Sequence, residues 1–112
     1  CSKILPGLFT GSDTVARDLE LLLSNKVTHV LNAAGVACRN YHEGSSDLVY
    51  RTMHLYDSPN QDISPFFYEA ISFIDDVICN GGSVFVHCHQ GVSRSASLVI
   101  AYLMWKRDLP FE

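Results

Sequence analysis

The segment from Val86 to Ser95 combines residue types that could bind a phosphate group and transfer it. Cys88 is followed six positions later by Arg94, with Gly91 between them. Backbone N–H groups of a tight loop can converge on a tetrahedral anion, and a helix N-terminus adds partial positive charge. Gly91 permits a positive φ and a close backbone approach, and the Arg94 guanidinium can hold two phosphate oxygens at once. The spacing therefore predicts a phosphate-binding loop.

Cys88 is the candidate nucleophile of this loop. The same donors and positive charges favour the thiolate over the thiol, and a thiolate can attack phosphorus without a separate base. Ser95 is placed to donate its hydroxyl to the sulfur, which would stabilise the thiolate as a leaving group. A buried structural cysteine is the simpler alternative, but it does not account for Gly91 and Arg94 together.

The residues around Cys88 complete the expected site. His87 would point away from the nucleophile along its strand, as a buried hydrogen-bonding partner that fixes the loop. Asn32, on a neighbouring strand, could hydrogen-bond the same loop. The residues expected to surround the phosphate are His89, Gln90, Gly91, Val92, Ser93 and Arg94.

Short apolar segments alternate along the chain with segments of helical periodicity. Strands are predicted over Leu8–Gly11, as an edge strand, and over His29–Ala34, Val49–Tyr56 and Ser83–His87. This alternation indicates an α/β domain whose mainly parallel central sheet is flanked by helices. Ligands of such sheets bind beyond the carboxyl ends of the strands, which is where the loop after Val86 lies.

Three helices are predicted around this sheet. The first is capped by Ser12 or Asp13. The second begins at Ser64–Pro65, with serine as the N-cap and proline in the first helical position, and ends at Asn80–Gly82. The third, largely buried, runs from Ala96 to Lys106. The apolar residues expected on their buried faces are Val15, Leu19, Leu22 and Leu23, then Phe66, Phe67, Ala70, Ile71, Ile74, Val77 and Ile78, and finally Tyr102 and Trp105.

Composition limits the class of protein. The chain has 112 residues, of which 47% are hydrophobic and 18% charged, so one folded domain with a buried core is expected. A net charge of -4 argues against a nucleic-acid-binding surface, and no apolar run is long enough to cross a membrane. The four cysteines form no C-x-x-C pair, so we expect a reducing compartment, cytoplasmic or nuclear. His29, His42 and His54 lack ligand spacing, and no metal is predicted.

The segment His87–Ala96 resembles the phosphate-binding signature of the dual-specificity protein phosphatases, within the protein tyrosine phosphatase superfamily. The resemblance extends to Ile4–Gly11, Val27–Asn32, Asp57–Ser64 and Ala101–Met104, and so spans nearly the whole chain. It implies a protein tyrosine phosphatase-like fold, hydrolysis through a cysteine, and no cofactor. Because family domains usually continue with further helices, we expect residues 1–112 to form a single catalytic domain truncated at its C-terminal helices.

The resemblance also implies that Asp57 is the general acid. Asp57–Asp62 is dense in turn formers and is expected to be an exposed loop. Asp57 would protonate the leaving oxygen in one in-line displacement and deprotonate the attacking water in the next. Asp62 fits a structural role better, because it is placed to cap the helix that begins near Ser64.

Several alternatives stay open at this stage. The chain could bind phosphorylated ligands without hydrolysing them, or it could transfer sulfur as rhodaneses do. The five-residue spacing between Cys88 and Arg94 and the adjacent Ser95 favour phosphoryl chemistry over sulfur transfer. The same chemistry could act on a phosphoinositide, an RNA 5′-phosphate or a phosphoglucan. No lysine or arginine lies between Cys88 and Arg94, which favours a phosphorylated protein as the substrate in dephosphorylation and signalling. The polar segment Arg39–Asp47, predicted as a surface loop, would set the depth of the pocket.

Overall fold

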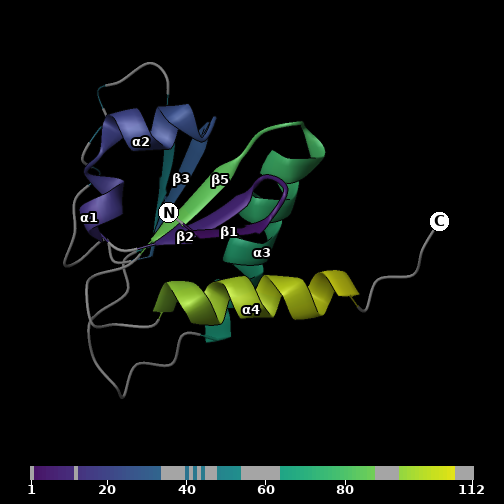
Figure 1. Cartoon of the computed structure of the whole chain (residues 1–112). Coiled ribbons are helices and arrows are strands. Elements are labelled where there is room, and N and C mark those ends of the chain that lie inside the picture. Colours follow the sequence, from purple (N-terminus) through teal and green to yellow (C-terminus); the bar gives the residue numbers. More distant parts are fainter. Residues whose placement is uncertain are drawn as a thin grey trace.

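A five-stranded sheet with helices on both faces forms the part of the chain that the structure, a computed structural model, describes (Figure 1). The described residues are 2–11, 13–33, 40, 42, 44, 48–53, 64–87 and 94–107. The elements, in chain order, are β1 (Ser2–Leu5), β2 (Leu8–Gly11), α1 (Asp13–Ala16), α2 (Leu19–Ser24), β3 (His29–Asn32), β4 (Val49–Thr52), α3 (Ser64–Cys79), β5 (Val84–His87) and α4 (Arg94–Arg107).

The strands follow the order β1-β2-β5-β3-β4, and only β1 runs antiparallel to its neighbour. The predicted α/β class with a mainly parallel sheet is therefore confirmed. The prediction that Leu8–Gly11 is an edge strand is wrong, because β2 lies between β1 and β5. The edge strand β1 turns into β2 at Pro6–Gly7, where Gly7 has a φ of 88°, a left-handed conformation that favours glycine, and a Cβ added there would lie 3.1 Å from the Gly82 carbonyl oxygen.

Two apolar cores hold the layers together. The apolar stripe predicted for α3 is confirmed, since Ala70, Ile74 and Val77 are buried against the sheet. A fully buried side chain such as Ile74 contributes roughly 1.5–3 kcal/mol. On the α3 and α4 face, buried residues from the sheet and α4 include Leu8, Leu31, Val84, Val86, Leu98, Val99 and Tyr102. On the α1 and α2 face, the core holds Phe9, Ala16, Leu22, Val27, Val30, Leu48 and Phe85.

The region between β2 and β3 contains two helices where one was predicted. Asp18 interrupts the predicted helix, and its Oδ1 accepts a hydrogen bond of 3.1 Å from the Leu21 backbone N–H as the N-cap of α2. The new helix start changes which residues face the sheet. Leu22 is buried, whereas Leu23 is 37% exposed, so the predicted burial of Leu23 is wrong.

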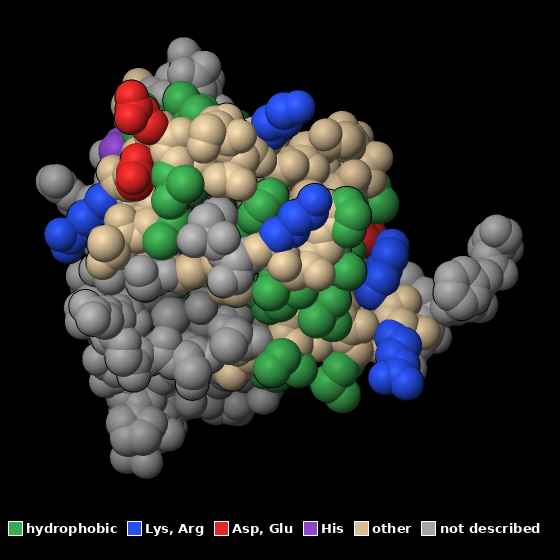
Figure 2. All heavy atoms as spheres, in the orientation of Figure 1, with side chains coloured by type: hydrophobic (Ala, Val, Ile, Leu, Met, Phe, Trp, Pro, Cys, Tyr) green, Lys and Arg blue, Asp and Glu red, His purple; other side chains and the backbone are tan. Residues whose placement is uncertain are grey.

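The prediction that α4 is largely buried is also wrong. Tyr102 is buried, but Ile100, Met104 and Trp105 are 55%, 63% and 37% exposed. Only one side of α4 packs on the sheet and α3, and Figure 2 shows hydrophobic side chains gathered over α4. None of the described helices is long and apolar enough to span a bilayer.

A polar link joins α4 to α3. The Tyr102 hydroxyl donates to Asp75 Oδ1 at 3.1 Å, and Lys106 Nζ lies 3.3 Å from the same oxygen. Burial, reinforced by the hydrogen bond to Asp75 and the charge of its carboxylate, raises the pKa of Tyr102 well above its usual value. Tyr102 therefore remains a neutral hydrogen-bond donor at physiological pH.

The helices α2 and α3 end in the same Schellman motif with different residues at its left-handed position. In α3, Gly81 has a φ of 82°, and the Gly82 N–H bonds the Val77 carbonyl at 2.9 Å. In α2, Lys26 occupies the equivalent position with a φ of 62°, and the Val27 N–H bonds the Leu22 carbonyl at 3.0 Å. A left-handed conformation costs a non-glycine residue roughly 1–2 kcal/mol, so Lys26 strains the end of α2.

Replacing Lys26 with glycine should therefore stabilise the fold by roughly 1 kcal/mol, or about 4 °C in Tm. The matched control is Gly81→Ala, which should destabilise by a similar amount. No atom lies within 4 Å of a Cβ added at Gly81, so backbone strain alone is tested there. Thermal unfolding measures both, and a lower Tm for Lys26→Gly would contradict this reading of the two helix ends.

Candidate active site at the carboxyl edge of the sheet

The carboxyl ends of four parallel strands meet along one edge of the sheet. Their register places Gly11, His87, Asn32 and Thr52 side by side, as the last residues of β2, β5, β3 and β4. Cys88 follows His87 directly in the chain. Ligands of parallel α/β sheets bind beyond this edge. The predicted phosphate-binding segment therefore begins where a ligand site is expected.

The end of β5 is fixed by packing on the α1 and α2 face. His87 is fully buried, and its ring stacks on Phe85 with centroids 5.8 Å apart. A Cβ added at Gly11 would lie 3.0 Å from the Phe85 ring, so only glycine fits beside it on β2 without moving that ring. The predicted burial of His87 is confirmed, while its bond to the following loop stays a prediction, because that loop lies outside the described residues.

A chain of amide and hydroxyl groups connects the ends of β3 and β4. Asn32 is fully buried, and its Nδ2 donates to Asn40 Oδ1 at 2.9 Å. Asn40 Nδ2 in turn donates to Thr52 Oγ1 at 2.8 Å. These bonds hold Asn40 against the edge of the sheet, next to the strand that leads to Cys88. The predicted bond between Asn32 and the phosphate-binding loop stays a prediction.

The segment that was predicted as a surface loop is anchored at a second point. The His42 backbone N–H donates to the Tyr50 hydroxyl at 3.1 Å, and His42 Nε2 donates to the Arg17 carbonyl at 2.7 Å. Sequence reasoning missed the anchors at Asn40 and His42. The available signal was Asn32, an amide side chain in an otherwise apolar strand that required a buried partner.

Six residues separate the end of β5 at His87 from the start of α4 at Arg94. Figure 1 shows the start of α4 on the side of the molecule where β5 ends. A helix of this length presents free backbone N–H groups and a partial positive charge at its first turn. This arrangement of strand, short connection and helix N-terminus can bind an anion.

Only part of the predicted catalytic set falls within the residues that the structure describes. Arg94 and Ser95 lie in the first turn of α4, although their side chains are outside the described part of the structure. Asp57 and the residues from Cys88 to Ser93 also lie outside it, so the roles of all of them stay predictions. Within the described residues, no three His, Cys, Asp or Glu side chains gather as a metal site would require.

Comparisons with known proteins point to one family. Residues 8–112 match the family described as dual specificity phosphatase, catalytic domain. The chain is 46% identical over 112 residues to the protein-tyrosine-phosphatase MKP1 of Arabidopsis thaliana, covering 14% of that protein. It is 45% identical over 111 residues, 99% of its length, to human dual specificity protein phosphatase 22, and covers 58% of it.

Solved structures give the same result. The crystal structure of DUSP15 superposes with a TM-score of 0.84 at 35% sequence identity, over 96% of this chain and 67% of that one. The chain thus spans from a seventh to less than two thirds of the length of these two curated relatives.

Proposed function

The chain belongs to the dual specificity phosphatase family, and we propose that it hydrolyses phosphate esters of protein side chains through a phosphocysteine on Cys88. The observation that carries this proposal is the position of the Cys-x5-Arg segment. It runs from the buried end of β5 at the carboxyl edge to the N-terminus of α4. That is the position in which backbone amides and a helix N-terminus stabilise a phosphate.

The proposed mechanism has two in-line displacements at phosphorus. The Cys88 thiolate attacks the phosphomonoester and forms an S–P bond as the bond from phosphorus to the side-chain oxygen breaks. Arg94 and the loop amides hold the equatorial oxygens, and Asp57 protonates the leaving oxygen. Water then attacks phosphorus, gives its proton to Asp57 and releases phosphate, while the Ser95 hydroxyl stabilises the departing thiolate. No step requires a metal or an organic cofactor.

Protein substrates fit this site better than lipid headgroups, because the five residues between Cys88 and Arg94 carry no lysine or arginine. The relatives are named as phosphatases of dual specificity or of protein tyrosine. We therefore propose both phosphotyrosine and phosphoserine or phosphothreonine as substrates, in cytoplasmic or nuclear signalling, where a thiolate stays reduced.

The test is release of inorganic phosphate from phosphotyrosine and phosphothreonine peptides, with a chelator present. A soluble phosphoinositide and an RNA 5′-phosphate serve as competing substrates, and thiosulfate tests for sulfur transfer. We expect turnover of both peptides that exceeds turnover of the competitors. Tight binding of the phosphopeptides without release of phosphate would instead indicate a binding module, and faster turnover of the lipid or the RNA would change the substrate class.

A further inference from the structure

Two adjoining hollows lie between α3 and the edge of the sheet formed by β4, away from the end of β5. Their volumes are about 410 and 530 Å³, within the range of roughly 300–1,000 Å³ that is typical of ligand sites. They share Phe73 and Asp76, and so form one groove. We call it the α3–β4 groove and define it by Val49, Arg51, Tyr68, Glu69, Phe73 and Asp76.

The floor of the α3–β4 groove is apolar. Val49 on β4 is 55% exposed, although valine is usually buried. Phe73 is partly buried, and its ring packs edge-to-face with the His29 ring, with centroids 5.9 Å apart. Partial burial lowers the pKa of His29, so this ring is neutral at pH 7 and adds no positive charge to the groove.

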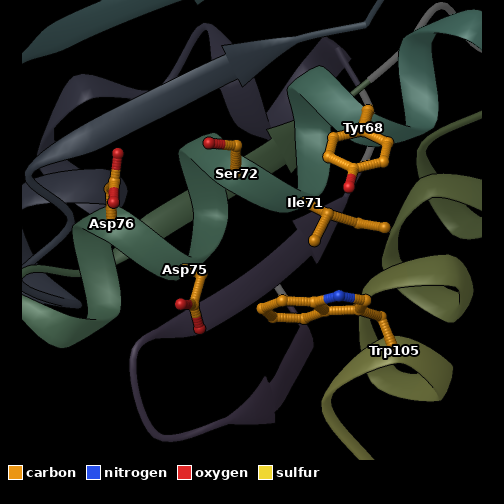
Figure 3. A pocket seen from close by; sticks show the side chains of 6 residues that line it. All are labelled: Tyr68, Ile71, Ser72, Asp75, Asp76 and Trp105. Carbon is orange, nitrogen blue, oxygen red and sulfur yellow. The ribbon is translucent and has the colours of Figure 1, made fainter. Parts of the chain in front are cut away.

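The rim of the groove carries an acidic group that lacks a basic partner among the described residues. Arg51 Nε is paired with Glu69 Oε2 at 3.2 Å, and Lys106 with Asp75. Asp76 lines both hollows, and its carboxylate makes no ion pair or hydrogen bond with any described residue, whereas its backbone carbonyl accepts from Asn80 Nδ2 at 2.7 Å. In Figure 3, the Asp76 carboxylate points away from Trp105, so it does not face α4. An unpaired carboxylate above an apolar floor complements a basic side chain that follows an apolar one.

One end of the α3–β4 groove points toward the edge of the sheet where the active site is expected. Arg51, near the carboxyl end of β4, contacts Glu69 near the start of α3, and the opposite end of the groove lies at Gly82, before β5 begins. The eleven helical residues from Glu69 to Cys79 span about 16 Å, which matches an extended segment of roughly five residues. One end of a bound segment would therefore lie toward the carboxyl edge of the sheet.

We propose that the α3–β4 groove binds an extended segment of the substrate protein in which an apolar side chain lies next to a lysine or arginine. The bound segment holds the substrate while its phosphorylated residue reaches the edge that carries Cys88. This recruiting role rests on the proposed phosphatase function, whereas the binding of a basic and apolar segment does not.

The test uses fluorescein-labelled hexapeptides and fluorescence anisotropy with the full chain. One peptide alternates arginine and leucine, a second arginine and serine, and a third glutamate and leucine. Asp76→Lys and Val49→Asp alter the groove. The matched control is Glu20→Lys, the same change of charge at an exposed residue of α2 on the opposite face of the sheet. Thermal unfolding verifies that each variant is folded. Asp76 is exposed on α3, so Asp76→Lys is expected to fold and still tests the groove if Val49→Asp does not fold.

We expect the arginine–leucine peptide to bind more tightly than the other two. Asp76→Lys and Val49→Asp should each weaken it by about fivefold, since a single such contact contributes on the order of 1 kcal/mol, and Glu20→Lys should change it by less than about twofold. Any of three results would overturn the proposal. Asp76→Lys and Glu20→Lys could weaken binding of the arginine–leucine peptide equally, the arginine–serine peptide could bind as tightly as the arginine–leucine peptide, or no peptide could bind. Self-association of the protein that Val49→Asp abolishes would also overturn it, because a second copy would then occupy the groove. Turnover of a small aryl phosphate by the same unaltered preparation reports separately on the proposed function.

Discussion

Replacing Cys88 with serine should lower kcat for a small aryl phosphate by a factor on the order of 10⁴ or more, as removal of an essential nucleophile does in other enzymes. A serine hydroxyl is not ionised at neutral pH and cannot replace the thiolate. The amides of the loop and Arg94 remain in this variant, so a phosphopeptide should still bind. The expected result is loss of turnover with retained binding, measured by phosphate release and by isothermal titration.

Cys79 supplies the matched control for this substitution. It is a free, exposed cysteine near the end of α3, and its sulfur lies 3.6 Å from Asp75 Oδ2. Cys79 lies at the C-terminal end of a helix, whereas Cys88 is followed in the chain by the N-terminus of α4. Cys79→Ser should leave kcat unchanged. Equal activity in both variants would remove Cys88 from the mechanism.

Replacing Asp57 with asparagine should have the second largest effect, and its size should depend on the leaving group. A general acid contributes typically 10²–10⁴-fold, and it matters most when the departing oxygen is strongly basic. We expect kcat to fall by about 10³-fold for phosphothreonine peptides, and much less for an aryl phosphate whose phenol is strongly acidic. The decrease in rate at high pH, where the acid is deprotonated, should also disappear from the pH profile.

Asp62→Asn is the control within the same loop segment. Asp62 is predicted to cap α3, and asparagine caps a helix about as well as aspartate, so Asp62→Asn should change neither stability nor kcat appreciably. A larger loss of turnover in Asp62→Asn than in Asp57→Asn would exchange the two assignments. Initial rates with both classes of substrate, together with thermal unfolding, distinguish these outcomes.

The sequence predicted correctly those helices and strands that depend mainly on their own residues. The stripe from Phe66 to Ile78 has helical spacing over sixteen residues of α3, and Gly81 ends that helix where the pattern placed its end. The run Val84–His87 is buried throughout, as its β-branched and aromatic residues indicated. Such local signals need no knowledge of the partner element.

Features that depend on distant residues could not be predicted in the same way. The prediction of an edge strand over Leu8–Gly11 is wrong because nothing in its own residues shows that Ser2–Leu5 pairs with it. Asn40 joins Asn32 to Thr52 through contacts between separate segments. The exposed side of α4 depends on which surfaces the sheet and α3 offer, and the hydropathy of Ile100, Met104 and Trp105 does not reveal it. Of the candidate site, the strand before Cys88 and the helix that begins at Arg94 could be predicted, and the anchoring of the neighbouring segment at Asn40 and His42 could not.

The most direct test asks whether a cysteine carries the phosphoryl group during turnover. The protein is quenched rapidly in acid while it hydrolyses an aryl phosphate, and its proteolytic fragments are then analysed by mass spectrometry. We predict one phosphoryl group on the fragment that contains Cys88, formed within the first turnover, and none on the fragment that contains Cys79. Phosphate released at full rate with Cys88 unmodified at every quench time would contradict covalent catalysis by this residue.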